Sequence, residues 1–215
     1  MKVVCLIITL LCLIGGARLQ TTISVQKHND AVDFYNNARK DFTKKDYRSA
    51  SINFRRALEL APKKAEYSYG LASSYYELQK YDSAIKYINL TIVLKPNQSD
   101  YHNMAGNIFF HNKNYKKAIK NYSSSISYIK DSVSFSINNS MYNIAVSKYY
   151  LKDYDGAIET LSQLIKKAPA VSNYIYFRGV SYLKLKQTNN ACGDLKKAYS
   201  MGYSGAIKYL AKYCK

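Results

Sequence analysis

The amino-acid sequence predicts an all-α fold, a solenoid of about five helix-turn-helix repeats followed by a C-terminal capping helix. Three observations lead there: a residue period near 34, ladders of matched side-chain size that share it, and prolines that recur where repeats should end. Because each repeat buries its apolar face only against its neighbours, the repeats should share one continuous core. The period is carried by alanines separated by 34, 34, 39 and 34 residues: Ala50, Ala84, Ala118, Ala157 and Ala191.

Three further ladders keep this register. Small residues are needed where two helices approach most closely, and large ones fill the space between successive hairpins. Pro62, Pro96 and Pro169 close repeats one, two and four, where a helix must stop. The small ladder is Ala38, Ala72, Gly106, Ala145 and Gly179, the aromatic ladder is Tyr47, Tyr81, Tyr115 and Tyr154, and the large apolar ladder is Phe54, Ile88, Tyr122, Leu161 and Leu195.

This pattern resembles the tetratricopeptide repeat (TPR) family, whose motif has small residues at positions 8, 20 and 27 and proline at 32. The resemblance implies a right-handed superhelix over residues 31–205 that serves as an interaction scaffold. The fifth repeat departs from the motif with Arg178 at position 7 and Tyr203 at position 32. The second repeat fits best, through Leu71, Ala72, Tyr75, Tyr81, Ala84, Ile88 and Pro96. The expected repeats are 31–64, 65–98, 99–132, 138–171 and 172–205.

The first 17 residues are predicted to be a cleaved secretory signal peptide. Lys2 precedes the apolar run 3–14, and the small residues 15–17 supply a cleavage site after Ala17. We therefore expect a periplasmic or extracellular protein whose segment 18–30 is polar and flexible. Lipid anchoring at Cys12 is an alternative that the neighbouring residues disfavour, and a retained membrane anchor is another, disfavoured because the run is short.

The chain is strongly basic, with a formal net charge of +18. Export argues against nucleic acid as the partner of this charge. Two interpretations remain: a solvated face with cations near helix C-termini, or attraction to an acidic surface such as lipid headgroups or cell-wall polymer. Lysine doublets fall on the second helices or the turns after them, at 63–64, 116–117, 166–167 and 196–197.

Two cysteines, Cys192 and Cys214, remain in the mature chain, and they are equidistant in sequence from Tyr203. Residues opposite each other in an antiparallel hairpin have a nearly constant sum of positions, so these two should face one another across the final helix pair. An oxidising compartment would allow a disulfide; the alternative is two buried thiols. The cap, residues 206–215, is expected to place Ala206, Ile207, Leu210 and Ala211 on its apolar side.

The 39-residue step adds five residues, about 132–136, between repeats three and four. Insertions in solenoids map to loops on one face. Two interpretations of this insertion stay open: it is a tolerated surface loop, or it contacts a partner.

The family resemblance implies that the first helix of each repeat lines the concave face. Two aromatic rows and several asparagines then form a groove suited to an extended peptide or sugar. The alternative is that these rings pack repeats together. The acidic-tail clamp of some TPR proteins is absent, because Asp100 occupies a position that the clamp needs to be cationic. The predicted groove residues are Tyr35, Arg39, Tyr69, Tyr76, Asn107, Phe110, Tyr142, Asn143, Tyr149 and Tyr176.

No catalytic or metal-binding motif is present, and His28, His102 and His111 lack the spacing of metal ligands. We therefore expect no enzyme activity and no cofactor. The function predicted is a cell-envelope adaptor that binds a protein or peptide in the groove. Binding of carbohydrate or cell-wall polymer is the alternative.

Overall fold

The computed structural model describes the backbone of residues 2–129 and 134–214, and the side chains of residues 22, 24–129 and 136–214. Within these ranges every regular element is a helix, as predicted. The chain divides into two compact units, Met1–Lys95 and Pro96–Lys215.

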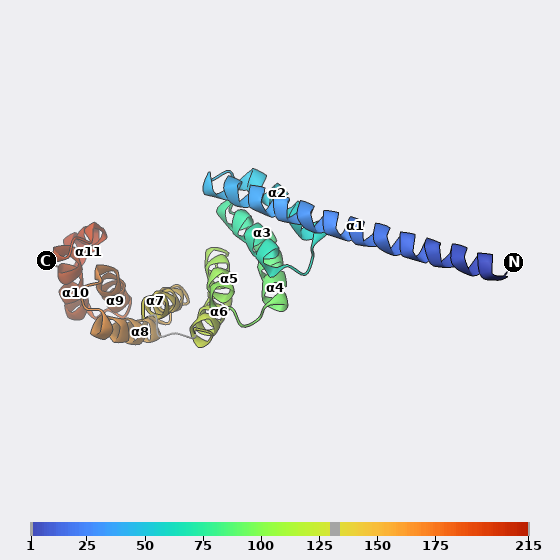
Figure 1. Ribbon diagram of the computed structural model, residues 1–215. Coiled ribbons are helices and arrows are strands. Elements are labelled where there is room, and N and C mark those ends of the chain that lie inside the picture. Colours follow the sequence, from blue (N-terminus) through green and yellow to red (C-terminus); the bar gives the residue numbers. More distant parts are fainter. Residues whose placement is uncertain (1, 130–133, 215) are drawn as a thin grey trace. The chain divides into compact units, whose positions relative to one another are not determined.

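The N-terminal unit holds two helical hairpins (Figure 1). Helix α1 (Lys2–Thr43) pairs with α2 (Tyr47–Leu60), and α3 (Ala65–Glu77) pairs with α4 (Tyr81–Leu94). In the C-terminal part of α1, Ala31 and Ala38 are fully buried. Residues 18–30, which we expected to be flexible, are helical and their described side chains are nearly all exposed. A packed helix extends readily, because each added residue gains one backbone hydrogen bond.

The C-terminal unit holds three hairpins and a cap. Its helices pair in chain order, each packing against the next. The first helices of the third and fifth repeats begin at Ser99 and Ser172, and the first helix of the fourth repeat begins at Ser134, four residues before Asn138. The elements are α5 (Ser99–His111), α6 (Tyr115–Ser127), α7 (Ser134–Tyr150), α8 (Tyr154–Lys167), α9 (Ser172–Lys184), α10 (Thr188–Ser200), η1 (Ser204–Ala206) and α11 (Ile207–Tyr213).

The core follows the predicted ladders. All five alanines that carry the period are fully buried, and the small and large apolar ladders are buried as well. Gly106 shows why the small ladder is small, because a Cβ there would come within 2.5 Å of the Tyr122 ring. The sequence register therefore identifies the packing positions correctly.

The turn inside each hairpin contains a residue with positive φ, which side chains other than glycine rarely adopt. These residues recur with the period of the alanine ladder, so they are a repeated element of the fold. With φ between 57° and 65°, they are Lys45, Gln79, Lys113, Lys152 and Lys186.

The next residue caps the second helix in three of the five repeats. The side chains of Asp46, Asn114 and Asp153 each accept a hydrogen bond from the backbone N–H three residues later. Lys80 and Gln187 hold the same place in the other two repeats and make no such bond.

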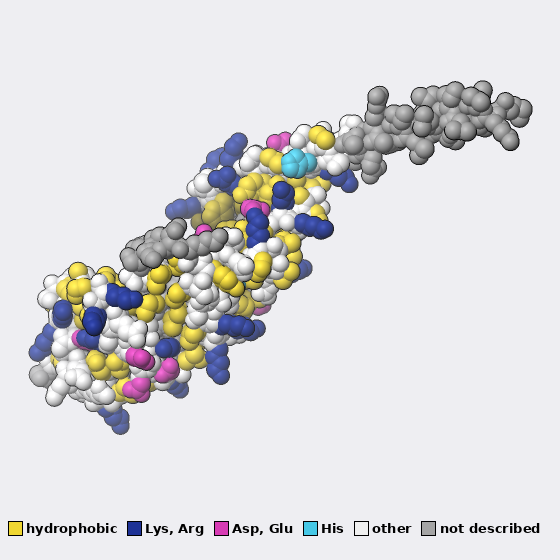
Figure 2. All heavy atoms as spheres, turned by 60° about the horizontal axis from the view of Figure 1, so that its bottom comes forward, with side chains coloured by type: hydrophobic (Ala, Val, Ile, Leu, Met, Phe, Trp, Pro, Cys, Tyr) yellow, Lys and Arg dark blue, Asp and Glu magenta, His cyan; other side chains and the backbone are white. Residues whose placement is uncertain are grey.

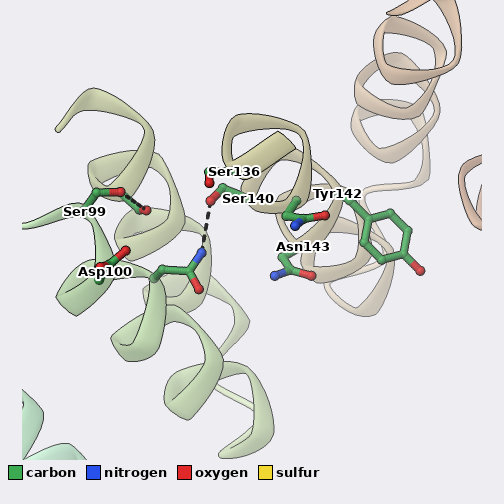
Figure 3. Close-up of a pocket in the computed structure, with 9 residues that line it drawn as sticks. Ser99, Asp100, Ser136, Ser140, Tyr142 and Asn143 are labelled. Atoms are coloured by element: carbon green, nitrogen blue, oxygen red, sulfur yellow. Dashed lines mark hydrogen bonds between the residues drawn. The ribbon is translucent and has the colours of Figure 1, made fainter. Parts of the chain in front are cut away.

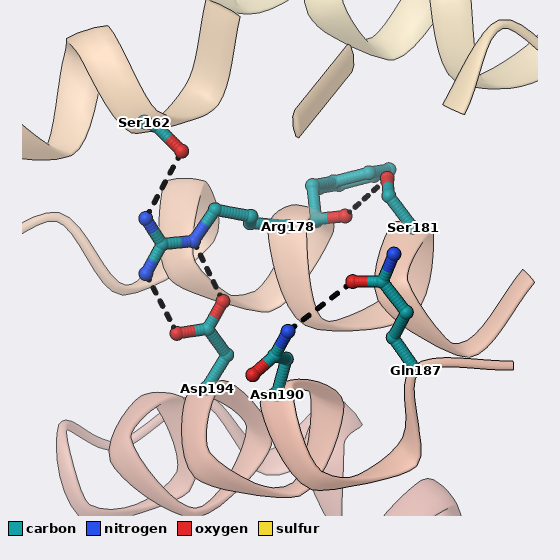
Figure 4. A network of polar contacts seen from close by, with 7 residues as sticks. Ser162, Arg178, Ser181, Gln187, Asn190 and Asp194 are labelled. Atoms are coloured by element: carbon teal, nitrogen blue, oxygen red, sulfur yellow. Dashed lines mark hydrogen bonds and ion pairs between the residues drawn. The ribbon is translucent and has the colours of Figure 1, made fainter. Parts of the chain in front are cut away.

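Arg178, which departs from the motif in the fifth repeat, links α9 by hydrogen bonds to α8 and α10 (Figure 4). Its Nε and Nη2 donate to the two carboxylate oxygens of Asp194 at 2.7 and 2.8 Å, and its Nη1 donates to Ser162 at 3.1 Å. Asp194 is only 8% exposed. Arg178 therefore ties α9 to α10 and α8 where the second repeat has the buried Leu71.

The cap brings Cys192 and Cys214 together as predicted, with the two sulfurs at disulfide distance and the Cα atoms 5.5 Å apart. The predicted apolar side of the cap is partly wrong. Ala206 is buried and Leu210 packs on the core, but Ile207 is 55% exposed and Ala211 is also exposed. A 3₁₀ turn precedes α11, and its tighter winding changes which residues face inward.

Residues 132 and 133 of the predicted insertion lie outside the described residues. Its described part, from residue 134, lengthens α7 at the N-terminal end.

Candidate functional site

The four groove residues predicted in the N-terminal unit lie on α1 and α3. Tyr35 is half-buried and packs against Tyr67 of α3, with ring centroids 4.8 Å apart. Arg39 is exposed and its guanidinium lies over the Tyr35 ring at 5.8 Å. Tyr69 and Tyr76 are half-buried. All four residues keep some exposure, and the Tyr35 ring also packs the two hairpins together.

The second predicted aromatic row, at position 12 of the repeats, packs across the hairpin turns. In each of the first four repeats, the aromatic ring at position 12 contacts the tyrosine that begins the second helix, at centroid distances of 5.1 to 6.2 Å. The pairs are Phe42–Tyr47, Tyr76–Tyr81, Phe110–Tyr115 and Tyr149–Tyr154. This row therefore holds each hairpin closed.

Other predicted residues of the C-terminal unit are also committed to packing. Asn107 accepts a hydrogen bond from the Tyr122 hydroxyl at 2.8 Å. Tyr149 packs on Phe177, and burial raises its pKa to about 12. Tyr176 is 9% exposed and its ring lies 4.2 Å from that of Tyr203, so it offers almost no surface to a ligand.

The remaining predicted pair, Tyr142 and Asn143, lines a polar pocket between α5 and α7, called here the α5–α7 pocket (Figure 3). Its volume is about 440 Å³. The Tyr142 ring is directed away from α5 and packs on Tyr174 and Phe177 of α9, and burial raises its pKa. The lining residues are Ser99, Asp100 and Asn103 of α5, Ser125 of α6, and Ser136, Asn139, Ser140, Tyr142 and Asn143 of α7.

Helical spacing explains why these side chains meet. Residues three or four apart lie on one face of a helix, so Ser136, Asn139 and Asn143 form one stripe along α7. On α5, Asp100 and Asn103 do the same.

The pocket exists because small side chains replace an aromatic pair. At two other junctions a tyrosine at position 5 packs on a tyrosine at position 3 of the next repeat, as in Tyr142–Tyr174 and Tyr35–Tyr67. Between α5 and α7 the equivalent pair is Asn103 and Ser140. Asn103 Nδ2 donates to Ser140 Oγ at 3.1 Å. This pair fills far less volume than two rings, and open space remains.

The polar groups of the pocket fall into two sets. Ser99 and Ser125 share a hydrogen bond at 2.9 Å, and Asn103 and Ser140 are paired as described. Within the described part of the chain, the side chains of Asp100, Asn139 and Asn143 have no intramolecular partner. These three groups are free to bind a ligand.

Sequence reasoning missed most of this pocket. It selected Tyr142 and Asn143 but not Asp100, Ser136 or Asn139. One signal was available: Asn103 interrupts a row that is tyrosine in the other four repeats.

A second hollow, of about 580 Å³, lies on the N-terminal unit at the turn between α2 and α3. Glu66 and Lys95 both line it and form an ion pair with each other. The hydrogen bond from Lys95 lowers the pKa of the Glu66 carboxyl. Since the only carboxylate among its described lining residues is already paired with Lys95, this hollow is a weaker candidate than the α5–α7 pocket.

Lys and Arg side chains are spread over the visible surface, with few Asp or Glu side chains between them (Figure 2). The lysine doublets lie on second helices or the turns after them, as predicted. Attraction of this surface to an acidic partner stays a prediction. Across the residues that the structure describes, no cluster of His, Cys, Asp and Glu could hold a metal ion. The same residues include no helix with an apolar stretch long enough to cross a membrane.

Comparison with known families decides the identity of the repeats. The profile of the tetratricopeptide repeat matches residues 139–170, the fourth repeat. The chain is a tetratricopeptide-repeat protein. A second profile, that of the anaphase-promoting complex, cyclosome, subunit 3, matches residues 43–125 of this TPR protein.

Solved TPR structures share its fold. MamA is 19% identical, with a TM-score of 0.71, over 86% of this chain and 95% of MamA. YrrB, a TPR protein with an unusual peptide-binding site, is 18% identical, with a TM-score of 0.73, over 89% of this chain and 96% of YrrB. MamA from Desulfovibrio magneticus RS-1 is 14% identical, with a TM-score of 0.73, over 81% and 96%. At these identities the likeness establishes the fold alone.

Proposed function

We propose that this TPR protein binds an extended segment of a partner protein, and that the α5–α7 pocket holds the main chain of that segment. The observation that carries the proposal is the pair of free amides, Asn139 and Asn143, on one face of α7 beside a volume of about 440 Å³. A side-chain amide offers one acceptor and two donors, so it can pair with both the N–H and the C=O of a peptide group. Such bonds hold an extended chain whatever its side chains.

Peptide is favoured over carbohydrate by the orientation of Tyr142. Binding of a sugar ring commonly uses an exposed aromatic face, and among the described residues that line the pocket Tyr142 is the only aromatic one. Its ring instead packs on α9. The lining left for a ligand consists of amides, hydroxyls and one carboxylate, which suits a peptide backbone.

The test is a selection of random linear peptides displayed on phage, with the purified chain as bait. Peptides recovered by the wild-type chain are then measured by fluorescence anisotropy against two variants. Asn139→Ala combined with Asn143→Ala should weaken binding about 10- to 30-fold, the effect of losing two or more hydrogen bonds. Asn138→Ala is the matched control, because Asn138 neighbours Asn139 on α7 but does not line the pocket.

Recovery of no peptide would overturn the proposal. So would a double variant that binds as tightly as Asn138→Ala. Circular dichroism of each variant checks that the helices are retained.

We also propose that the chain is exported, on the strength of Lys2, the apolar run 3–14 and the small residues 15–17. Cys192 and Cys214, at disulfide distance, are compatible with an oxidising compartment. Intact mass of the chain recovered from the periplasm of a bacterial host should correspond to a start at Arg18. A chain recovered from the cytoplasm with its first 17 residues would contradict export.

A further inference from the structure

We infer that the α5–α7 pocket selects a basic side chain, lysine or arginine, in the bound segment, and that Asp100 binds this side chain. The inference rests on the proposed peptide binding and adds its specificity. Asp100 is the only charged residue among the nine that line the pocket. It is exposed, and within the described residues its carboxylate makes no hydrogen bond or ion pair.

This local charge opposes that of the whole chain. The protein carries 32 Lys and Arg residues against 14 Asp and Glu, yet none of the described residues that line the pocket is Lys, Arg or His. The long-range field of a basic protein attracts acidic ligands. A ligand group inside the pocket instead meets one carboxylate and neutral amides, so at short range a cation is favoured.

The geometry fits a long basic side chain on an extended peptide. Asp100 lies on α5, and Asn143 lies on α7 across the pocket (Figure 3). The other free amide, Asn139, lies on the same face of α7 one turn before Asn143. A peptide bonded to the amides through its main chain can therefore extend one side chain toward α5. An ammonium or guanidinium group provides several N–H donors for a carboxylate. A divalent metal ion fits poorly, because it needs more oxygen ligands than one carboxylate and nearby amides supply in a rigid arrangement.

The matched control for Asp100 is Asp155. Each is an acidic residue in the first turn of a helix of the C-terminal unit, and both are exposed. Asp100→Asn and Asp155→Asn thus change the net charge and the helix-dipole interaction in the same way. Only the first removes the charge from the pocket.

The experiment repeats the peptide selection with the wild-type chain, D100N and D155N as bait, in about 0.5 M salt, where charges well apart no longer interact appreciably. The wild type and D155N should enrich Lys or Arg at one position of the aligned peptides, and D100N should lose that enrichment. For a selected peptide, replacing that basic residue with norleucine should weaken binding to the wild type about two- to fivefold, as for an exposed ion pair. The same replacement should leave binding to D100N unchanged.

Two results would overturn the inference. Selected peptides without a fixed basic position, or with one that persists in D100N, would remove the role of Asp100 while leaving peptide binding intact. Recovery of no peptides by any bait would remove the peptide-binding function and the inference together.

Discussion

Replacing Arg178 with methionine should lower the free energy of unfolding of the C-terminal unit by about 3 kcal/mol. Methionine keeps much of the length of the side chain but none of its charge or donors. The substitution leaves the carboxylate of Asp194, a buried residue, without its cationic partner. It also removes the bond to Ser162 on α8.

The magnitude follows from the burial of the pair. Removing one partner of a fully buried, hydrogen-bonded ion pair costs about 3–5 kcal/mol, because the other charge stays behind without compensation. The side chains of Arg178 and Asp194 are 22% and 11% exposed, so water reaches the remaining carboxylate to some extent. The lower end of that range therefore applies.

The assay is urea unfolding followed by circular dichroism, together with amide hydrogen exchange in α9 and α10, which detects opening of the terminal repeat alone. A double-mutant cycle with Asp194→Leu isolates the pair. The double variant should be more stable than the sum of the two single changes predicts, by about 2 kcal/mol, because it leaves no unpaired charge. Lys95→Met is the matched control: its ion pair with Glu66 is 49% and 41% exposed, and its loss should cost less than about 1 kcal/mol.

A loss below about 1 kcal/mol for Arg178→Met, equal to that of Lys95→Met, would refute this reasoning. Strict additivity in the cycle would refute it too, because it would mean that the two charges do not depend on each other.

Three further predictions concern the repeated turns and a buried phenol. Asn114→Ala should destabilise the chain by about 1 kcal/mol in urea unfolding through loss of a helix N-cap, whereas Lys80→Ala, at the equivalent position without a capping bond, should change little. Lys113→Gly should raise stability by about 0.5 kcal/mol in the same assay, because glycine adopts φ of 58° without strain, and a clear loss would argue against strain at this turn. Burial raises the pKa of Tyr149 from 10.0 to about 12, so its contribution to stability is complete below pH 10 and is lost as pH rises through 12. Tyr149→Phe should reduce that alkaline loss in urea unfolding measured from pH 9 to 12, and an unchanged pH profile would show that this phenol does not contribute.

Much of the fold could be predicted from the sequence because the residues that pack each hairpin recur at fixed positions within each repeat. Ala50 and its four equivalents are buried since each occupies the closest approach of two helices. The same regularity did not predict the turn residues with positive φ, because four of the five are lysines and not glycine. It also misplaced Ile207, because the 3₁₀ turn before α11 shifts the helical phase.

The candidate site was predicted less well because groove and packing positions carry the same residue types. Tyr176 and Tyr142 occupy the same position in their repeats, yet only Tyr142 borders an open pocket. The difference depends on the neighbour across each junction. That neighbour belongs to a different repeat, and its size decides whether space remains.

The sequence by itself determined the repeat architecture, the register of the buried alanines and the facing of Cys192 and Cys214. These follow from periodicity, which is written along the chain. Only the tertiary structure decided which polar residues lie unpaired in a pocket. It alone also decided that Arg178 forms an ion pair with Asp194. Both depend on the distance between side chains of separate helices. The small pair Asn103 and Ser140, where other junctions hold two rings, is the physical reason that the α5–α7 pocket is open.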